Sequence, residues 1–363
     1  MKKNKFLFLS ALCAMMAMFF VACDNDDDPT PDPTPDPEKT TAFYVLDGGS
    51  FGNNNAAISY VNGEGEVTND IFKDLNGRNL GDMGQNMIRY GSKLYVSVYG
   101  SKTVEILNAA DAKSLKQLKL LDEQGNERAP RMFAAHGDKV YLTTYDGYVA
   151  KIDTASMTVD AYVQVGPNPD GITIANGRIY TADTDGMNWP SQSTSVSVVD
   201  INTFKMEKTL TVSLNPNYIY SDSDGDVYVI CMSDYSDDKS YIIQRIDAKT
   251  DEVTTIEGVK AYKMTVYDDI AYIMFNDYYA GAVKFYKYDL KNEKLLSDNF
   301  ITDGTVIDSP NGIGIDPLRG DIYVAKSNKT NNGDVYVFTA EGKLKTQFET
   351  APYPSDFVFM VDK

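Results

Sequence analysis

The sequence predicts an all-β protein, a seven-bladed β-propeller closed by pairing of its N- and C-terminal strands. Three observations predict this fold. A strand centred on tyrosine recurs seven times, with successive spacings of 51, 46, 39, 48, 44 and 51 residues. Short β-branched and aromatic runs alternate with Gly, Asn and Asp turns, without a convincing amphipathic helix. A last strand pattern has no tyrosine strand after it, and it is therefore expected to complete the first unit.

The first 22 residues, 1–22, have the pattern of a lipoprotein signal peptide. Lys2, Lys3 and Lys5 form a positively charged start, and an apolar stretch follows as far as Val21. A stretch of this length and position is typical of a cleaved secretory signal rather than a membrane span. The sequence therefore predicts export from the cytoplasm.

A lipid anchor and a tether are predicted for residues 23–40. The end of the signal, Phe20-Val21-Ala22-Cys23, resembles the bacterial lipobox, in which small residues precede a cysteine that becomes diacylated. Cys23 is thus the predicted lipidation site, and it attaches the protein to the outer membrane through lipid only. An acidic run and a Pro-rich run follow Cys23, and these residues are expected to form an extended, semi-rigid tether.

The acidic run also bears on location. It resembles the surface-export signal of Bacteroidetes lipoproteins, which implies that the domain lies outside the cell. A solvated spacer in the periplasm is the alternative, because charge alone does not distinguish the two. We expect a lipid-anchored protein exposed at the cell surface.

Residues 41–363 form the predicted propeller. The central tyrosines of the recurring strand are Tyr44, Tyr95, Tyr141, Tyr180, Tyr228, Tyr272 and Tyr323. A second strand follows each of them after a polar loop, and a third follows after a turn. Most are also preceded by a strand, so each unit of about 40 to 50 residues supplies one four-stranded blade. A β-sandwich of similar strand count would not require such regular units.

The two ends of the domain are predicted to share one blade. Tyr44 lacks a preceding strand, whereas residues 354–360 repeat the preceding-strand pattern at the other end of the chain. Pairing these segments removes two exposed sheet edges. We therefore expect the ring to depend on the last strand for stability.

Charge and composition exclude several functions. The chain has 34 Lys and Arg against 52 Asp and Glu, a formal net charge of −18, which opposes attraction to nucleic acid or anionic lipid. Cys13 leaves with the signal and Cys231 lies in an apolar strand, so no internal disulfide is expected. His136, the single histidine, rules out a multi-histidine metal site and gives no support for a histidine-based triad.

No catalytic residue, metal site or cofactor is predicted. Asp222, Asp224 and Asp226 resemble a calcium loop superficially, but Ser233 stands where such a loop needs an acidic residue at its twelfth position. A tight β-turn is the better interpretation. Acidic pairs such as Asp268-Asp269 are expected to be solvated in turns.

A ligand site is predicted where the first strands of the blades begin. These starts and the loops between the second and third strands emerge on one face of a propeller, around the channel, where concave sites form. The polar residues expected to ring the channel mouth are Asn86, Arg131, Asp170, Asn217, Lys263 and Asn311. Proline precedes most of them, which turn chemistry alone also explains.

The loops that converge on this face carry aromatic residues in six of the seven repeats. The aromatic candidates are Phe51, Tyr99, Tyr145, Trp189, Tyr235 and Tyr278, and the seventh loop carries Asn328 in their place. Trp189 is the strongest of these, because its loop is long and no strand needs it. Packing between blades is the alternative role for each ring.

Beyond the repeat, the segments Gly48-Gly49-Ser50-Phe51-Gly52 and Gly81-Asp82-Met83-Gly84-Gln85-Asn86-Met87, with the later segment 317–325, resemble the YncE-like surface-lipoprotein propellers of Bacteroidetes. That family includes cobalamin-capturing (BtuG-like) lipoproteins that sit over a TonB-dependent transporter of the outer membrane. The resemblance implies a non-enzymatic protein that captures a corrinoid and passes it to such a transporter.

Other ligand classes stay open at this point. A corrinoid is rich in amides and lacks strong negative charge, which suits an acidic protein, whereas anionic haem or ferric catecholates face poorer long-range electrostatics. Arg131 and Lys263 act against this argument at contact distance. A propeller that binds a glycan, a siderophore or another protein is the alternative, and a propeller hydrolase or lyase ranks last.

Overall fold

The computed structural model describes residues 39–234, 240–277, 281–328 and 330–362. Cys23, Tyr235 and Tyr278 lie outside the described residues. Residues Glu38–Lys363 form one compact unit, and every sheet described below lies within it. In the described ranges, no helix is long and apolar enough to cross a membrane.

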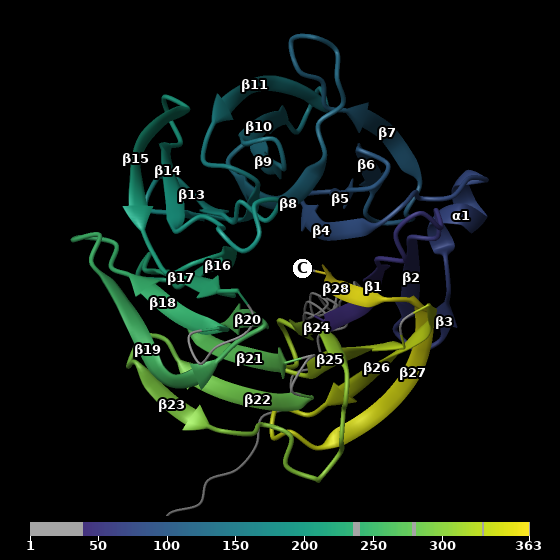
Figure 1. Cartoon of the computed structure of the whole chain (residues 1–363). Coiled ribbons are helices and arrows are strands. Elements are labelled where there is room, and N and C mark those ends of the chain that lie inside the picture. Colours follow the sequence, from purple (N-terminus) through teal and green to yellow (C-terminus); the bar gives the residue numbers. More distant parts are fainter. Residues whose placement is uncertain (1–38, 235–239, 278–280, 329, 363) are drawn as a thin grey trace, which may run out of the picture. The chain divides into compact units, whose positions relative to one another are not determined.

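Seven four-stranded antiparallel sheets are arranged as blades around a common axis, which confirms the predicted seven-bladed propeller (Figure 1). Blade 1 contains β28 (Pro354–Asp362), β1 (Lys39–Asp47), β2 (Ala57–Asn62) and β3 (Val67–Thr68). Blade 2 contains β4 (Gly84–Tyr90), β5 (Lys93–Val98), β6 (Thr103–Asn108) and β7 (Ser114–Lys119). Blade 3 contains β8 (Pro130–His136), β9 (Lys139–Thr144), β10 (Tyr148–Asp153) and β11 (Thr158–Gln164).

The remaining four blades follow in chain order. Blade 4 contains β12 (Pro169–Ala175), β13 (Arg178–Asp183), β14 (Ser195–Asp200) and β15 (Lys205–Thr211). Blade 5 contains β16 (Pro216–Ser221), β17 (Val227–Cys231), β18 (Ile242–Ile246) and β19 (Val253–Lys260). Blade 6 contains β20 (Lys263–Tyr267), β21 (Ile270–Asp277), β22 (Ala282–Asp289) and β23 (Lys294–Ser297). Blade 7 contains β24 (Pro310–Ile315), β25 (Ile322–Asn328), β26 (Asn331–Phe338) and β27 (Leu344–Pro352).

The second strand of each blade carries the recurring tyrosine and is buried on both faces. The rings of Tyr44, Tyr95, Tyr180 and Tyr228 are among the largest fully buried side chains. Each strand reads as an apolar run because neighbouring blades cover its two faces. Cys231 ends one such strand as a free, buried thiol, and burial raises its pKa to about 12, so it is unreactive at neutral pH.

One short helix, α1 (Ile71–Asn76), interrupts the β-structure between blades 1 and 2. The side chain of Asp70 accepts a hydrogen bond from the Lys73 amide at its start, and Gly77 ends it in a left-handed conformation. Phe72 anchors the helix in the core. A helix of this length depends on such packing, which explains why it left no clear periodicity in the sequence.

The ring closes as predicted, because β28 and β1 pair antiparallel over their whole lengths, from Lys39 opposite Asp362 to Asp47 opposite Pro354. The first strands of successive blades also contact one another around the axis. We call the end of the axis where these inner strands begin the loop face, and the opposite end the turn face. Lys39 and Asp362 lie at the turn face.

Candidate functional site

A cavity of about 860 Å³ opens at the loop face, and we call it the mouth cavity. All seven blades contribute to its wall. The wall includes residues 48–51, 83–85 and 309–311 and the side chains of Arg131, Asp170, Asn217, Tyr218, Met232, Tyr241, Tyr262, Lys263, Asn276, Ser327, Thr330, Tyr353 and Ser355. This size and this mixture of aromatic and polar groups are typical of a small-molecule site.

One repeated backbone hydrogen bond positions the wall. In six blades of the described chain, the residue four positions after the recurring tyrosine donates its N–H to the carbonyl of the residue just before the inner strand. The donors are Gly48, Tyr99, Tyr145, Thr184, Met232 and Ser327, and the acceptors are Tyr353, Met83, Ala129, Asn168, Asn215 and Ser309. The loops are thereby held against the inner-strand starts, on the same face of the propeller.

Six of the predicted site residues line the mouth cavity. They are Phe51, Arg131, Asp170, Asn217, Lys263 and Asn311. Asn86 lies deeper and lines a second cavity of about 480 Å³ further along the axis. Five of the six polar residues expected at the channel mouth thus line the mouth cavity, and Asn86 does not.

Arg131 and Asp170 form an ion pair between blades 3 and 4. The Nε of Arg131 donates to Asp170 at 2.8 Å, its Nη2 donates to the second carboxylate oxygen, and its Nη1 donates to Gln85 at 3.0 Å. Burial by itself lowers the pKa of Arg131, but the adjacent carboxylate outweighs this and holds the pKa above its ordinary value. Such a bidentate pair is rigid as well as strong.

Tyr99 and Tyr145 both pack against this guanidinium. The Arg131 Cζ lies 4.9 Å from the Tyr99 ring centre and 4.8 Å from the Tyr145 ring centre, and the two rings meet edge to face. Neither tyrosine is part of the mouth-cavity wall. These two aromatic candidates therefore pack against Arg131 and do not line the cavity themselves.

A second ion pair joins blades 6 and 1. The Nζ of Lys263 donates to Asp356 at 2.7 Å and to the carbonyl of Ser355 at 2.8 Å. The other carboxylate oxygen of Asp356 accepts from the Asn86 side chain at 2.7 Å. This pair and Tyr218 lie where the mouth cavity meets the second cavity, since Lys263 and Tyr218 line both.

Two further candidates lie on the loop face but outside the wall of the mouth cavity. Trp189 is 65% exposed. The Asn328 side chain donates to the carbonyl of Asn332 at 2.9 Å and to Asp334 at 3.0 Å. It lines a separate polar cavity of about 470 Å³ with Asp308 and Glu349.

Besides Phe51, the wall of the mouth cavity contains four tyrosines that the sequence analysis did not select. Tyr218, Tyr241, Tyr262 and Tyr353 line it, and the Tyr218 and Tyr262 rings lie 6.4 Å apart. One signal was present: Tyr262 stands at an inner-strand start where most blades have proline. Tyr241 has no such signal.

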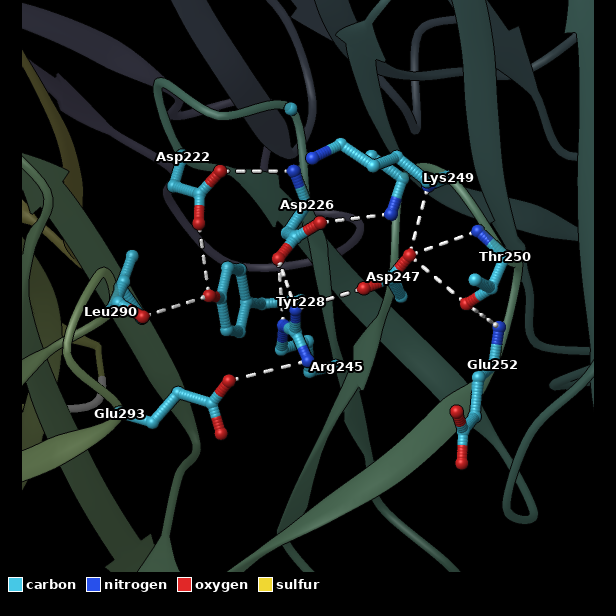
Figure 2. Close-up of polar contacts among 12 residues, drawn as sticks. Asp222, Asp226, Tyr228, Arg245, Asp247, Lys249, Thr250, Glu252, Leu290 and Glu293 are labelled. Atoms are coloured by element: carbon cyan, nitrogen blue, oxygen red, sulfur yellow. Dashed lines mark hydrogen bonds and ion pairs between the residues drawn. The ribbon is translucent and has the colours of Figure 1, made fainter.

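The acidic turn at Asp222–Asp226 lies at the turn face, and the structure confirms that it is a turn. The Gly225 amide donates to the Asp222 carbonyl, and the Asp222 side chain accepts from the Asp226 amide at 2.9 Å and from the Tyr228 hydroxyl at 3.0 Å. Figure 2 shows Arg245 between Asp226 and the neighbouring carboxylates. The carboxylate oxygens of Asp222 and Asp226 are therefore engaged by hydrogen bonds of the turn and by the ion pair with Arg245. In the described ranges, no group of three or more His, Cys, Asp or Glu is placed to hold a metal ion.

Solved structures with the same architecture have low sequence identity to this chain. Hydrazine synthase of Kuenenia stuttgartiensis is 16% identical, with a TM-score of 0.53 over 70% of this chain and 76% of that one. The dihydro-heme d1 dehydrogenase NirN, solved in complex with DHE, is 10% identical, with a TM-score of 0.56 over 88% and 75%. The computationally designed Ika8 protein is 11% identical, with a TM-score of 0.56 over 88% and 90%. These similarities support the fold alone.

No curated protein matches the sequence. A family match covers residues 41–360, which is nearly the whole propeller. The family is described as a domain of unknown function, DUF5074. The chain therefore belongs to the DUF5074 family, in which it forms a closed seven-bladed β-propeller.

Proposed function

We propose that this protein is a surface-exposed lipoprotein that binds a small molecule, a corrinoid such as cobalamin, and passes it to a TonB-dependent transporter of the outer membrane. The observation that carries the proposal is the mouth cavity at the loop face. Its volume of about 860 Å³ is within the range of small-molecule sites.

The wall chemistry supports a broad ligand with polar substituents. Tyr218, Tyr241 and Tyr262 contribute aromatic rings to the wall, and Asn276 and Asn311 contribute carboxamides. Aromatic rings contact an apolar macrocycle, and carboxamides exchange hydrogen bonds with amide substituents. A corrinoid has both features.

The proposed lipid anchor precedes the propeller in the sequence. Lys39, the first described residue, pairs with Asp362 at the turn face, whereas the mouth cavity opens at the loop face. The lipid at Cys23 and the surface location stay proposals, because residues 1–38 lie outside the described part. Replacement of Cys23 by serine is expected to abolish labelling by radioactive palmitate and to release the protein from membranes.

Isothermal titration calorimetry tests the ligand. The unit Glu38–Lys363 is titrated with cyanocobalamin, and an unrelated seven-bladed propeller serves as the control. Saturable heat with one site per chain supports corrinoid capture. Absence of heat, together with absence of co-eluting red colour in gel filtration, rejects cobalamin as the ligand.

A glycan is the second candidate ligand, and the polar cavity of about 470 Å³ in blade 7 favours it. Ser327, Asn331 and Asn332 supply hydroxyl and amide groups there, next to Glu349. Such groups are suited to sugar hydroxyls. Retention on immobilised polysaccharide that is lost in Asn331→Ala, but kept in Tyr353→Ala, would favour the glycan.

A further inference from the structure

The mouth cavity contains two cationic side chains, and each already has a carboxylate partner on another blade. Arg131 pairs with Asp170, and Lys263 pairs with Asp356. All four side chains are largely withdrawn from solvent, with exposed fractions of 14% or less. The two pairs together add no net charge to the cavity.

Arg131 is engaged by hydrogen bonds and by two aromatic rings. Its nitrogens donate to Asp170 and Gln85, and the rings of Tyr99 and Tyr145 pack against the guanidinium. An incoming anion would have to displace a bidentate carboxylate from a guanidinium that the two rings hold in place. Arg131 is thus not available to pair with an anionic ligand.

Lys263 is held in a similar way. Its Nζ donates to Asp356 and to the Ser355 carbonyl and lies 5.7 Å from the Tyr218 ring centre. Asp356 is in turn fixed by the side chain of Asn86 and by the Met87 amide. A ligand carboxylate at Lys263 would meet the carboxylate of Asp356 at close range.

The carboxamides of the wall are oriented by backbone carbonyls. The Nδ2 of Asn276 donates to the Pro310 carbonyl at 2.9 Å, and the Nδ2 of Asn311 donates to the Pro354 carbonyl at 2.8 Å. A carbonyl only accepts hydrogen bonds, so the nitrogen of each amide must face it. The Oδ1, an acceptor, is then the second polar atom of each of these two wall carboxamides.

From these contacts we propose that the mouth cavity selects uncharged ligands that donate hydrogen bonds, such as molecules with primary carboxamides, and rejects anions of the same size. The proposal rests on the binding role proposed above and deepens it by naming the ligand class. It predicts that anionic tetrapyrroles, catecholates and acidic sugars are poor ligands, whatever their shape.

Two pairs of probes test this selectivity on the unit Glu38–Lys363. The first pair is cyanocobalamin and cobyrinic acid, a related macrocycle with carboxylates on its side chains. The second is N-phenyl-1-naphthylamine and its sulfonated relative 1-anilinonaphthalene-8-sulfonate. In both pairs the neutral compound is expected to bind at least about tenfold more tightly, the change expected from one unpaired buried charge.

The outcomes separate the two proposals. Equal or tighter binding of either anion overturns the selectivity, even if cyanocobalamin binds and corrinoid capture stands. Failure of cyanocobalamin alone rejects the corrinoid, while the naphthylamine pair still decides the selectivity. Failure of both neutral compounds overturns the selectivity as well.

Asp170→Asn provides a test by gain of binding. Removing this charge leaves Arg131 without its ionic partner, and affinity for the sulfonated probe should rise about tenfold or more. Asp153→Asn is the matched control, because it removes a carboxylate from the Lys139 ion pair near the turn face and should leave probe affinity unchanged. Asp356→Asn gives the same test at Lys263 if Asp170→Asn does not fold. An unchanged affinity in a folded variant contradicts the proposal.

Discussion

At the residue scale, Asp183 shows how the environment of one side chain sets a property of the protein. It ends β13 at the start of the Trp189 loop, and its carboxylate accepts hydrogen bonds from Thr181, Ser195 and Ser197. No cation pairs with it in the described ion pairs, and burial raises its pKa to about 6 despite the three hydroxyls. A charged Asp183 therefore destabilises the folded state.

We predict that Asp183→Asn removes a pH dependence of stability. The folded pKa lies above the unfolded value of about 3.9, so stability from this group is present below pH 4 and is lost as pH rises through 6. The amide stays neutral, and the variant should be more stable at pH 8 by about 3 kcal/mol. Urea unfolding at pH 4.5 and pH 8 measures this difference.

Asp200→Asn is the control for that measurement. Asp200 ends β14 just before a turn, where the Thr203 amide and side chain lower its pKa. Its replacement should not raise stability at pH 8. If the free energy of unfolding of the wild type and of Asp183→Asn changed with pH in parallel, burial of the charged carboxylate would not destabilise the fold, which would contradict the prediction.

Two exposed aromatic residues on the loop face give a second prediction. Tyr353 lines the mouth cavity and is 39% exposed, whereas Trp189 is 65% exposed and lies outside the wall. We expect Tyr353→Ala to weaken cyanocobalamin binding about tenfold, as loss of an aromatic contact does. Trp189→Ala should change affinity less than about twofold and stability by no more than about 0.5 kcal/mol.

Calorimetric titration of both variants checks this prediction. Circular dichroism must show that Tyr353→Ala keeps the wild-type fold. A larger loss of affinity in Trp189→Ala would mean that the long loop closes over the ligand. The expectation from the sequence, which ranked Trp189 first, would then hold.

At the element scale, the inner strands approach one another closely around the axis. Gly312 in β24 lies against β28, where a β-carbon would come within 2.4 Å of the Ser355 carbonyl oxygen. Gly171 in β12 lies against β16 in the same way, within 2.6 Å of the Asn217 carbonyl oxygen. Glycine is needed at both positions because a β-carbon would collide with the backbone of the neighbouring inner strand.

We predict that Gly312→Ala destabilises the protein by about 1–3 kcal/mol, because the added methyl group must push β24 and β28 apart. Thermal unfolding followed by circular dichroism measures the cost. Gly304→Ala is the control: nothing lies within 4 Å of its β-carbon position, and only its left-handed backbone (φ +83°) opposes the change. A cost for Gly312→Ala no larger than that of Gly304→Ala would contradict close packing of the inner strands.

The strands also show where prediction from sequence ends. Strand order, length and the buried second strands followed from repeat spacing and apolar runs. The inner strands, however, contain irregularities just after their starts, between Pro130 and Phe133, Pro169 and Ile172, Pro216 and Tyr218, and Pro310 and Gly312. A bulge changes which side chains face the channel, so alternation along the sequence could not assign them.

At the scale of the whole molecule, one strand closes the ring. β28 occupies the inner position of blade 1 and pairs with β1, although the two segments lie at opposite ends of the chain. Without β28, an edge of β1 and the sides of β24 and β4 that contact β28 lose their partners. Ring closure thus supports three neighbouring blades at once.

We predict that deletion of residues 353–363 lowers the melting temperature by more than 10 °C or prevents soluble expression, because it opens an edge strand and exposes core. A circular permutant is the control: it joins residues 39 and 362 by a short linker and opens the chain at the exposed turn of Gly125. It keeps every strand and should unfold in one transition. A truncated protein with an unchanged melting temperature would refute the role of closure.

The sequence by itself determined the number of blades, the order of their strands, the offset closure and the positions of the inner-strand starts. These follow from local patterns, since spacing and apolar runs act over a few residues. Only the tertiary structure decided which side chains meet: Arg131 with Asp170, Lys263 with Asp356, and Tyr218 with Tyr262. These partners lie on different blades, and their contact depends on ring geometry and on strand bulges, which no local pattern records.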